Sequence, residues 1–127
     1  MSNLKVDAME SKTAGGTVAV SASSGNITTL TSSASITIAM SDSNNYKVTL
    51  AHNATFNNPT SITAGQTGAI FITQDGTGSR TASWGSYWDF TGGTAPTLST
   101  TAGAVDRIDY VVLDSTNIQA VATLDYS

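Results

Sequence analysis

His52 is the single histidine of the 127-residue sequence, and it is the first residue to consider for catalysis. A histidine that acts as a general base needs a nucleophile or an orienting carboxylate within hydrogen-bonding reach. The neighbouring residues, Leu50-Ala51 before it and Asn53-Ala54 after it, supply neither group. A small hydrolase that pairs His52 with an Asp is therefore one functional hypothesis, but the sequence predicts no catalytic residue and no enzymatic activity.

Three carboxylates near the C-terminal end, Asp106, Asp109 and Asp114, suggest a second kind of chemistry. Paired acids hydrolyse glycosidic bonds, but Asp106 and Asp109 are an odd number of residues apart and point to opposite faces of a regular strand. We interpret these residues as turn residues or partners of an arginine. The segment Asp42–Asn45 begins like a calcium loop but lacks the central Gly and the terminal Glu. Since the chain also has no cysteine, we expect no metal and no cofactor.

The aromatic residues Trp84, Tyr87, Trp88 and Phe90 form the most attractive binding motif. Exposed aromatic faces stack on sugar rings and anchor protein interfaces. Strand alternation places Trp88 and Phe90 on one face and Tyr87 on the other. We expect Trp88 and Phe90 to pack in the core, and Trp84 and Tyr87 to be the better candidates for a surface role.

The elements that position these residues are predicted to be strands. Apolar residues alternate with Ser, Thr or Gln in short runs, which is typical of half-buried strands. Asn-, Asp- and Gly-rich segments at 41–45, 74–79 and 114–117 separate some of these runs and favour tight turns. The sequence therefore predicts an all-β protein, an antiparallel β-sandwich or jelly roll with an extended N-terminal arm. The clear runs are 17–21, 35–40, 46–50, 69–73, 107–113 and 118–122, and weaker ones lie at 26–30 and 80–84.

Two regions are expected along the chain. Residues 1–25 combine charged residues with Gly15-Gly16 and are predicted to form an arm or tether. Residues 26–127 are predicted to form the sandwich domain. The arm either docks on a neighbouring subunit or is a frayed terminus. If it docks, its apolar residues are the contacts. The predicted interface or binding residues are Leu4, Val6, Met9, Trp84, Tyr87 and Trp88.

Composition excludes several classes of partner. Charged residues make up 11% of the chain and the formal net charge is −4, so no basic surface is available to bind nucleic acid. The N-terminal residues lack the basic segment followed by an apolar run that is typical of a signal peptide, and no apolar run is long enough to cross a membrane, so we expect neither export nor a membrane span. Thr, Ser and weak charge leave sheet edges poorly protected against association, which favours subunit contacts and a homo-oligomer.

Several turn motifs in the segment 56–106 carry a resemblance to a known family. They are Ile62-Thr63-Ala64-Gly65-Gln66-Thr67-Gly68, Ile72 to Arg80 with its Gln-Asp-Gly-Thr-Gly core, Trp84-Gly85-Ser86, and Gly92 to Ser99. In this order they resemble a β-rich module of virion structural proteins of tailed bacteriophages, found in tail fibres, appendages and small capsid-surface proteins of phages of aquatic bacteria.

The resemblance implies a non-enzymatic virion component. Because fibre proteins with this module usually continue for hundreds of residues, the short chain favours a capsid decoration, or cement, protein that stabilises the shell by contacts with the major capsid protein. A trimer would match the local threefold positions of such a shell. The alternative is a tail-fibre or adhesin module, located in the tail, that binds host surface glycans through Trp84 and Tyr87.

Overall fold

Period-two alternation produces nine strands among residues 25–126, the part of the chain that the computed structural model describes. In the longer strands, inward apolar positions alternate with outward Thr, Lys or Gln. A single turn of 3-10 helix, η1 (Thr91–Gly93), follows β7. The strands are β1 (Ile27–Thr29), β2 (Ser35–Ile36), β3 (Asn45–Leu50), β4 (Ala54–Phe56), β5 (Thr67–Gln74), β6 (Ala82–Trp84), β7 (Trp88–Phe90), β8 (Val105–Asp114) and β9 (Asn117–Thr123).

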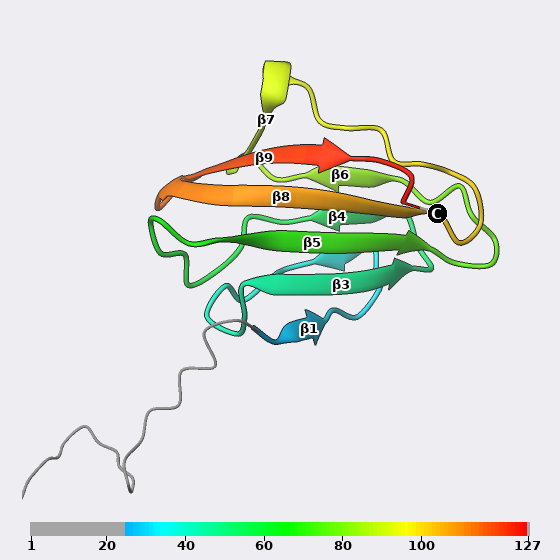
Figure 1. The fold of residues 1–127 in the computed structure, drawn as a ribbon, viewed down its shortest axis with the longest axis horizontal. Helices are drawn as coiled ribbons and strands as arrows, with labels where there is room; N and C mark the ends of the chain where they lie inside the picture. Colours follow the sequence, from blue (N-terminus) through cyan, green and yellow to red (C-terminus); the bar gives the residue numbers. More distant parts are fainter. Residues whose placement is uncertain (1–24, 127) are drawn as a thin grey trace, which may run out of the picture.

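These strands form two sheets, one of six strands in the order β1-β3-β5-β8-β9-β7 and one of three strands in the order β2-β4-β6. Figure 1 looks onto the larger sheet, with the smaller sheet behind it. From β1 to β6 the chain passes from one sheet to the other after every strand, so it winds three times around the core. Successive windings stack side by side, as in a β-helix.

This winding confirms the all-β fold class and the two-layer sandwich, and it corrects the predicted strand pairing. The expected pairing was antiparallel, but β1·β3, β3·β5, β2·β4, β4·β6 and β7·β9 are parallel. Only β5·β8 and β8·β9 are antiparallel among the described pairs. The physical reason is that the turns at 41–45 and 74–79 lead to the other sheet, so neighbours within one sheet run in the same direction.

The core lies between the two sheets. On β3, Tyr46, Val48 and Leu50 are buried while Lys47 and Thr49 are exposed. Ile70 of β5 pairs with Ile108 of β8, and both are fully buried. Burying one such side chain stabilises the fold by about 1.5–3 kcal/mol. The smaller sheet contributes Ile36, Ala54 and Phe56, and the segments beside it add Ile38, Met40 and Leu98.

Two buried polar side chains fix the loops at one end of the sandwich. Gln74 Nε2 donates to the carbonyl oxygens of Arg80 and Ser99, each at 2.8 Å, and Gln74 Oε1 accepts from the Arg80 amide at 2.9 Å. Asp106 accepts from the backbone amides of Ser99 at 2.7 Å and Asp125 at 2.8 Å. The loop before β8 and the C-terminal tail are therefore held by side chains whose polar atoms are satisfied in the interior.

Gly68 permits the closest approach between two windings. A Cβ built on Gly68 would lie 1.7 Å from the carbonyl oxygen of Asn44 and 2.8 Å from the hydroxyl of Tyr110. The same Asn44 carbonyl accepts a hydrogen bond from the Tyr110 hydroxyl at 2.6 Å. Glycine is needed here because any side chain would collide with the backbone.

Residues 1–24 and Ser127 lie outside the described part of the chain. The predicted arm contacts Leu4, Val6 and Met9, and the predicted strand 17–21, fall there, so the arm stays a prediction. Within residues 25–126, no helix is long and apolar enough to cross a membrane.

Candidate functional site

The aromatic residues predicted from the sequence meet where the smaller sheet approaches β7. The Trp84 ring, at the end of β6, stacks on Phe56 with ring centroids 4.5 Å apart. The rings of Trp88 and Phe90 approach Trp84 edge-on, at 5.2 Å and 5.0 Å. Such edge and stacked pairs add about 0.5–1.5 kcal/mol each beyond the area they bury. Trp84 therefore joins the two sheets as well as lining the surface.

A turn between β6 and β7 is held in place by one distant side chain, that of Asn58. Asn58 Oδ1 accepts from the Tyr87 amide at 2.8 Å, and Asn58 Nδ2 lies 3.2 Å from the Ser86 hydroxyl to which it donates. The Trp88 amide donates to the Gly85 carbonyl at 3.1 Å, which closes the turn. A Cβ on Gly85 would lie 2.4 Å from Asn58 Oδ1, so glycine is required for this packing.

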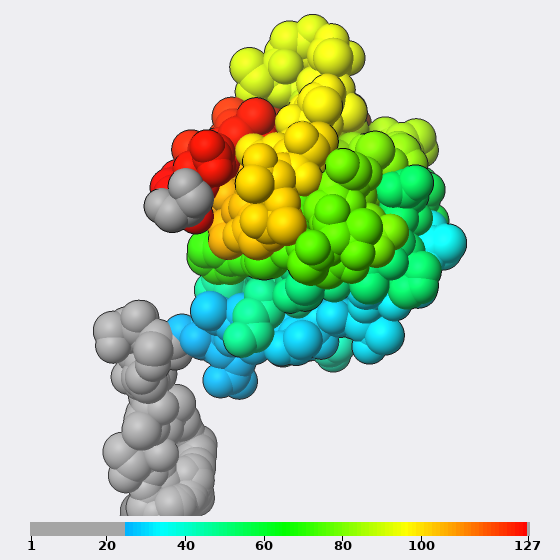
Figure 2. Space-filling view, turned by 90° about the vertical axis from the view of Figure 1, so that its right-hand side faces the viewer, coloured from blue at the N-terminus to red at the C-terminus, as the bar shows by residue number. Residues whose placement is uncertain are grey.

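Beside this turn lies an open hollow of about 300 Å³, which we name the Trp84 hollow. Ser86 and Asp89 are exposed in its lining, while Trp84 and Phe90 are half-buried. It lies next to the β7–η1 segment, which projects from the sandwich at the top of Figures 1 and 2. Its lining residues are Trp84, Gly85, Ser86, Trp88, Asp89, Phe90, Gly93 and Ala95.

The two indole N–H groups of the cluster differ in their partners. Trp88 Nε1 donates to the Asn57 carbonyl at 3.1 Å. Trp84 Nε1 is buried and has no hydrogen-bond partner among the described residues. A buried donor without an acceptor costs about 1–3 kcal/mol, so an oxygen atom that reached this group would be bound favourably.

The three aromatic residues predicted as contacts differ in burial. Trp84 and Tyr87 are half-buried and pack against the core, and Trp88 is buried, 6% exposed. Trp84 and Trp88 line the hollow together. The sequence analysis did not identify Asn58 and Asp89 as residues of the site. For Asp89 the signal was present, because it alternates with Trp88 and Phe90 and must point away from them.

The residues considered for catalysis do not form a triad. His52 Nδ1 lies 3.0 Å from the Ser32 hydroxyl, which also accepts a hydrogen bond from the Ala51 amide. His52 is exposed, and no carboxylate hydrogen-bonds to its ring among residues 25–126. The pair therefore lacks the third group that would orient the imidazole.

The carboxylates have structural partners. Asp109 Oδ2 binds Arg107 Nε at 3.0 Å, which confirms the interpretation that one of these acids is a partner of an arginine. Asp114 lies in the β8–β9 turn, where the Thr116 amide, followed by Asn117, holds the pKa of its carboxyl below the ordinary value. In the described part of the chain, no cluster of three His, Cys, Asp or Glu side chains is arranged to hold a metal ion.

An all-β sandwich with a weakly charged, Thr-rich surface and a preformed open hollow is the architecture of a structural or binding module. Comparison with known families then identifies the kind of module. The family described as "Putative phage tail fibre C-terminal domain" matches residues 32–118, more than half of the chain. The chain belongs to this family and is a phage virion structural protein. No curated protein and no solved structure matches it.

Proposed function

We propose that this protein is a non-enzymatic component of the phage tail fibre, and that its domain binds a saccharide of the host surface through the Trp84 hollow. The family match carries the tail-fibre assignment, because it favours that alternative over the capsid decoration role expected from chain length. The contacts in a fibre are then with other virion proteins of the tail, in place of the major capsid protein.

The residues of the hollow suit a sugar ring. Trp84 and Phe90 are half-buried, and the parts of their rings that line the hollow offer apolar surface to the C–H groups of a pyranose, as aromatic rings do in many binding sites. Ser86 and Asp89 are exposed in the lining and can exchange hydrogen bonds with sugar hydroxyl groups. Because Asp89 is a carboxylate and the whole chain carries a net charge of −4, the favoured ligand is a neutral saccharide.

The side chains around the hollow are held in place before any ligand binds, which supports a role in saccharide binding. Asn58 fixes the turn that carries Ser86, and stacking on Phe56 fixes the Trp84 ring, so few side chains need to be ordered when a ligand binds. A rigid site loses less conformational entropy on binding and therefore gains affinity.

Saccharide binding is tested with an array of neutral and acidic glycans, followed by titration of the best neutral ligand. We expect saturable binding that Asp89→Ala weakens at least about tenfold, since a lost charged hydrogen bond costs about 1.5–3 kcal/mol. Asp42→Ala is the matched control, because Asp42 is also exposed but lies in the turn before β3. Absence of binding across the array, or equal loss with both variants, would refute the saccharide assignment.

Location is tested separately, with antibody against this chain and electron microscopy of intact virions. Gold label on the tail is expected, and label confined to the capsid would refute the fibre assignment whatever the result for saccharides.

The absence of enzymatic activity is tested by incubating the protein with any saccharide that it binds. A product that forms with the wild type but not with His52→Ala would contradict it.

The trimer predicted from the sequence stays a prediction. The mass of the isolated protein in solution tests it.

A further inference from the structure

A second hollow lies beside β6, at the opposite end of this strand from the Trp84 hollow. We name it the Arg80 hollow. It has a volume of about 170 Å³, and its lining comprises Arg80 to Ala82 on one wall and Pro96 to Leu98 with Thr100 on the other. The two hollows share no lining residue, so the Arg80 hollow is a site of its own.

The two hollows lie end to end between the same two segments. One segment contains β6, and the other is the segment 93–100, which follows η1 and is seen in yellow crossing the upper part of Figure 1. The two segments run in opposite directions, because 93 and 95 meet the end of β6 whereas 96–100 meet its start. Ala82 and Trp84, two positions apart on β6, line one hollow each. We name the pair of hollows the β6 groove.

The backbone of β6 is open on the side of the groove. β6 is an edge strand of the smaller sheet, with β4 as its single partner among the described strands. Its odd-numbered positions bond to β4, as when the Gly85 amide donates to the Phe56 carbonyl at 2.8 Å. In a parallel ladder the positions between them point the other way. The amide and carbonyl groups of Ala82 and Trp84 therefore have no partner in β4 and are available to a ligand in the groove.

A buried side chain holds the two walls of the Arg80 hollow at a fixed separation. Gln74 is 3% exposed, and its Nε2 donates to the carbonyl oxygens of Arg80 on one side and Ser99 on the other, each at 2.8 Å. The Ser79 amide donates to the Thr100 carbonyl at 2.8 Å, which joins the same two segments a second time. The hollow is therefore formed before a ligand binds, and little conformational entropy is lost on binding.

The chemistry of the Arg80 hollow suits an uncharged ligand that is rich in hydroxyl groups. The guanidinium group of Arg80 is ion-paired with Asp75, with 2.9 Å between Nη2 and Oδ2, so little net charge is left for an ionic ligand. Pro96 offers apolar surface to C–H groups. Side-chain hydroxyl groups can both donate to and accept from sugar hydroxyl groups. The exposed residues of the lining that carry them are Thr81, Thr97 and Thr100.

The β6 groove is longer than one sugar ring. Arg80 and Trp84 are four residues apart, and extended chain rises about 3.3 Å per residue, so they are separated by about 13 Å. A single pyranose ring fills one hollow, whereas a linear chain of rings reaches both. Contacts in the second hollow are then made by a ligand that is already bound in the first, so they add affinity at a small entropic cost.

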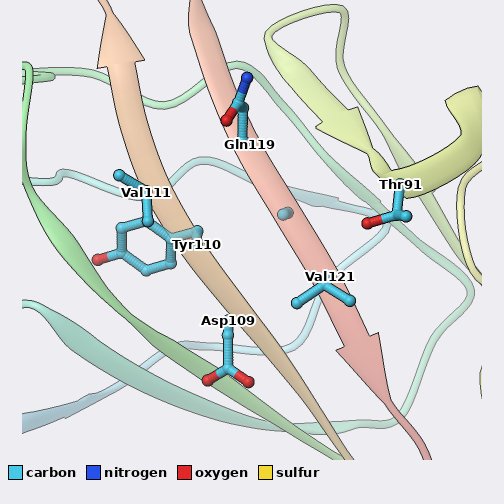
Figure 3. A pocket seen from close by; sticks show the side chains of 7 residues that line it. Thr91, Asp109, Tyr110, Val111, Gln119 and Val121 are labelled. Carbon is cyan, nitrogen blue, oxygen red and sulfur yellow. The ribbon is translucent and has the colours of Figure 1, made fainter.

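The hollow on the outward side of the larger sheet does not extend this groove. Figure 3 shows it between β8 and β9, with Val111, Gln119 and Val121 near Thr91 of η1. It has a volume of about 230 Å³ and shares no lining residue with the two hollows of the groove. Gln119 is therefore a reference position that a ligand in the groove does not contact.

We propose that the saccharide bound by this domain is a linear, neutral oligosaccharide that lies along the β6 groove and occupies the Trp84 hollow and the Arg80 hollow together. This inference rests on the function proposed for the Trp84 hollow. It adds the length of the ligand and its course along β6.

Calorimetric titration of the full chain tests the proposal. The probe is the neutral glycan that binds best on the array, used intact and shortened in steps to a single sugar. Affinity should rise at least about tenfold between the single sugar and the fragment that fills both hollows. Thr97→Tyr, which places a larger side chain in the Arg80 hollow, should remove most of this gain. Thr101→Tyr should keep it, because Thr101 is exposed nearby but lines neither hollow.

The outcomes separate this inference from the function on which it rests. If the single sugar binds as tightly as the longest fragment, or if Thr97→Tyr keeps the full gain, the extended groove is overturned and the Trp84 hollow stands as a saccharide site. If no glycan binds, both proposals are overturned.

Nuclear magnetic resonance locates the glycan without a substitution. The single sugar should shift the amide signals of Ser86 and Asp89, which belong to the Trp84 hollow. The fragment that fills both hollows should also shift those of Ala82 and Thr97. The Gln119 signal should stay unchanged with every fragment. Shifts that never extend to Ala82 and Thr97, or that include Gln119 to the same degree, would count against an oligosaccharide in the β6 groove.

Discussion

Replacement of Asp106 by alanine should destabilise the fold strongly, because this carboxylate is buried and holds two segments at once. Asp106 is 2% exposed and accepts the backbone amides of Ser99 at 2.7 Å and Asp125 at 2.8 Å. Hydrogen bonds to a charged group contribute about 1.5–3 kcal/mol each, and alanine also leaves the Ser99 amide without its acceptor. Removal of the buried charge offsets part of this loss, since burial disfavours an ion. The expected net loss is about 3 kcal/mol in the free energy of unfolding.

Urea unfolding followed by tryptophan fluorescence measures this effect, since Trp84 and Trp88 lie against the core. For a domain of this size, a loss of about 3 kcal/mol lowers the melting temperature by about 12–20 °C. Asp106→Asn, which keeps one acceptor oxygen, should fall between alanine and the wild type. Asp109→Asn is the control, because its side chain is 40% exposed and exposed ion pairs contribute about 0–1 kcal/mol. An Asp106→Ala variant within about 1 kcal/mol of wild type would refute the reasoning.

Three further predictions concern the windings and the turn after β6. Gly68→Ala should lower the unfolding free energy by at least about 2 kcal/mol in the same urea assay, because its Cβ would collide with the Asn44 carbonyl; unchanged stability would contradict the close approach. Burial raises the pKa of Tyr110 and Tyr46 above the ordinary value near 10, so the unfolded chain ionises first and stability should fall as the pH rises above about 10. The unfolding free energy of Tyr110→Phe should decline less steeply with pH than that of the wild type. Parallel pH curves for the two proteins would argue against ionisation of Tyr110 as the cause. Asn58→Ala should weaken saccharide binding at least about fivefold in titration, because the turn between β6 and β7 loses its two hydrogen bonds to Asn58. Equal affinity of the variant and the wild type would show that the turn keeps its conformation without Asn58.

The sequence was sufficient to predict the long strands because their side chains alternate over six or more residues. β3, β5, β8 and β9 coincide with predicted runs, and their apolar positions form the core. Ala54–Phe56 and Trp88–Phe90 were not predicted as strands. Three residues are too few to establish a period of two, and Gly and Asn beside them suggest turns.

Strand pairing could not be predicted from turn chemistry. Segments 41–45 and 74–79 have the same Asp-, Asn- and Gly-rich composition as hairpin turns, yet each leads from one sheet to the other. Only the predicted turn 114–117 closes a hairpin, between β8 and β9. The direction that a chain takes after a turn depends on where the apolar face of the next strand finds a partner, and this is a property of the whole fold.

The candidate site was predicted only in part, for a related reason. The aromatic cluster was visible in the sequence as Trp84 to Phe90, but Asn58, which holds its turn, lies 29 residues before its partner Tyr87. Contacts over such separations leave no local pattern. Val111 and Val121 have the same residue type as core valines, and only the sheet register places them outward.

The winding between two sheets has a consequence for how this family can vary. Ile27, Asn45 and Ala69 are register partners across β1, β3 and β5, yet more chain separates the second pair than the first. The extra residues are accommodated at the ends of the sandwich, and the ladder is unchanged. Segments between windings can therefore lengthen or shorten without repacking the interior, so the ends of the sandwich tolerate insertions while the ladder between the strands is retained.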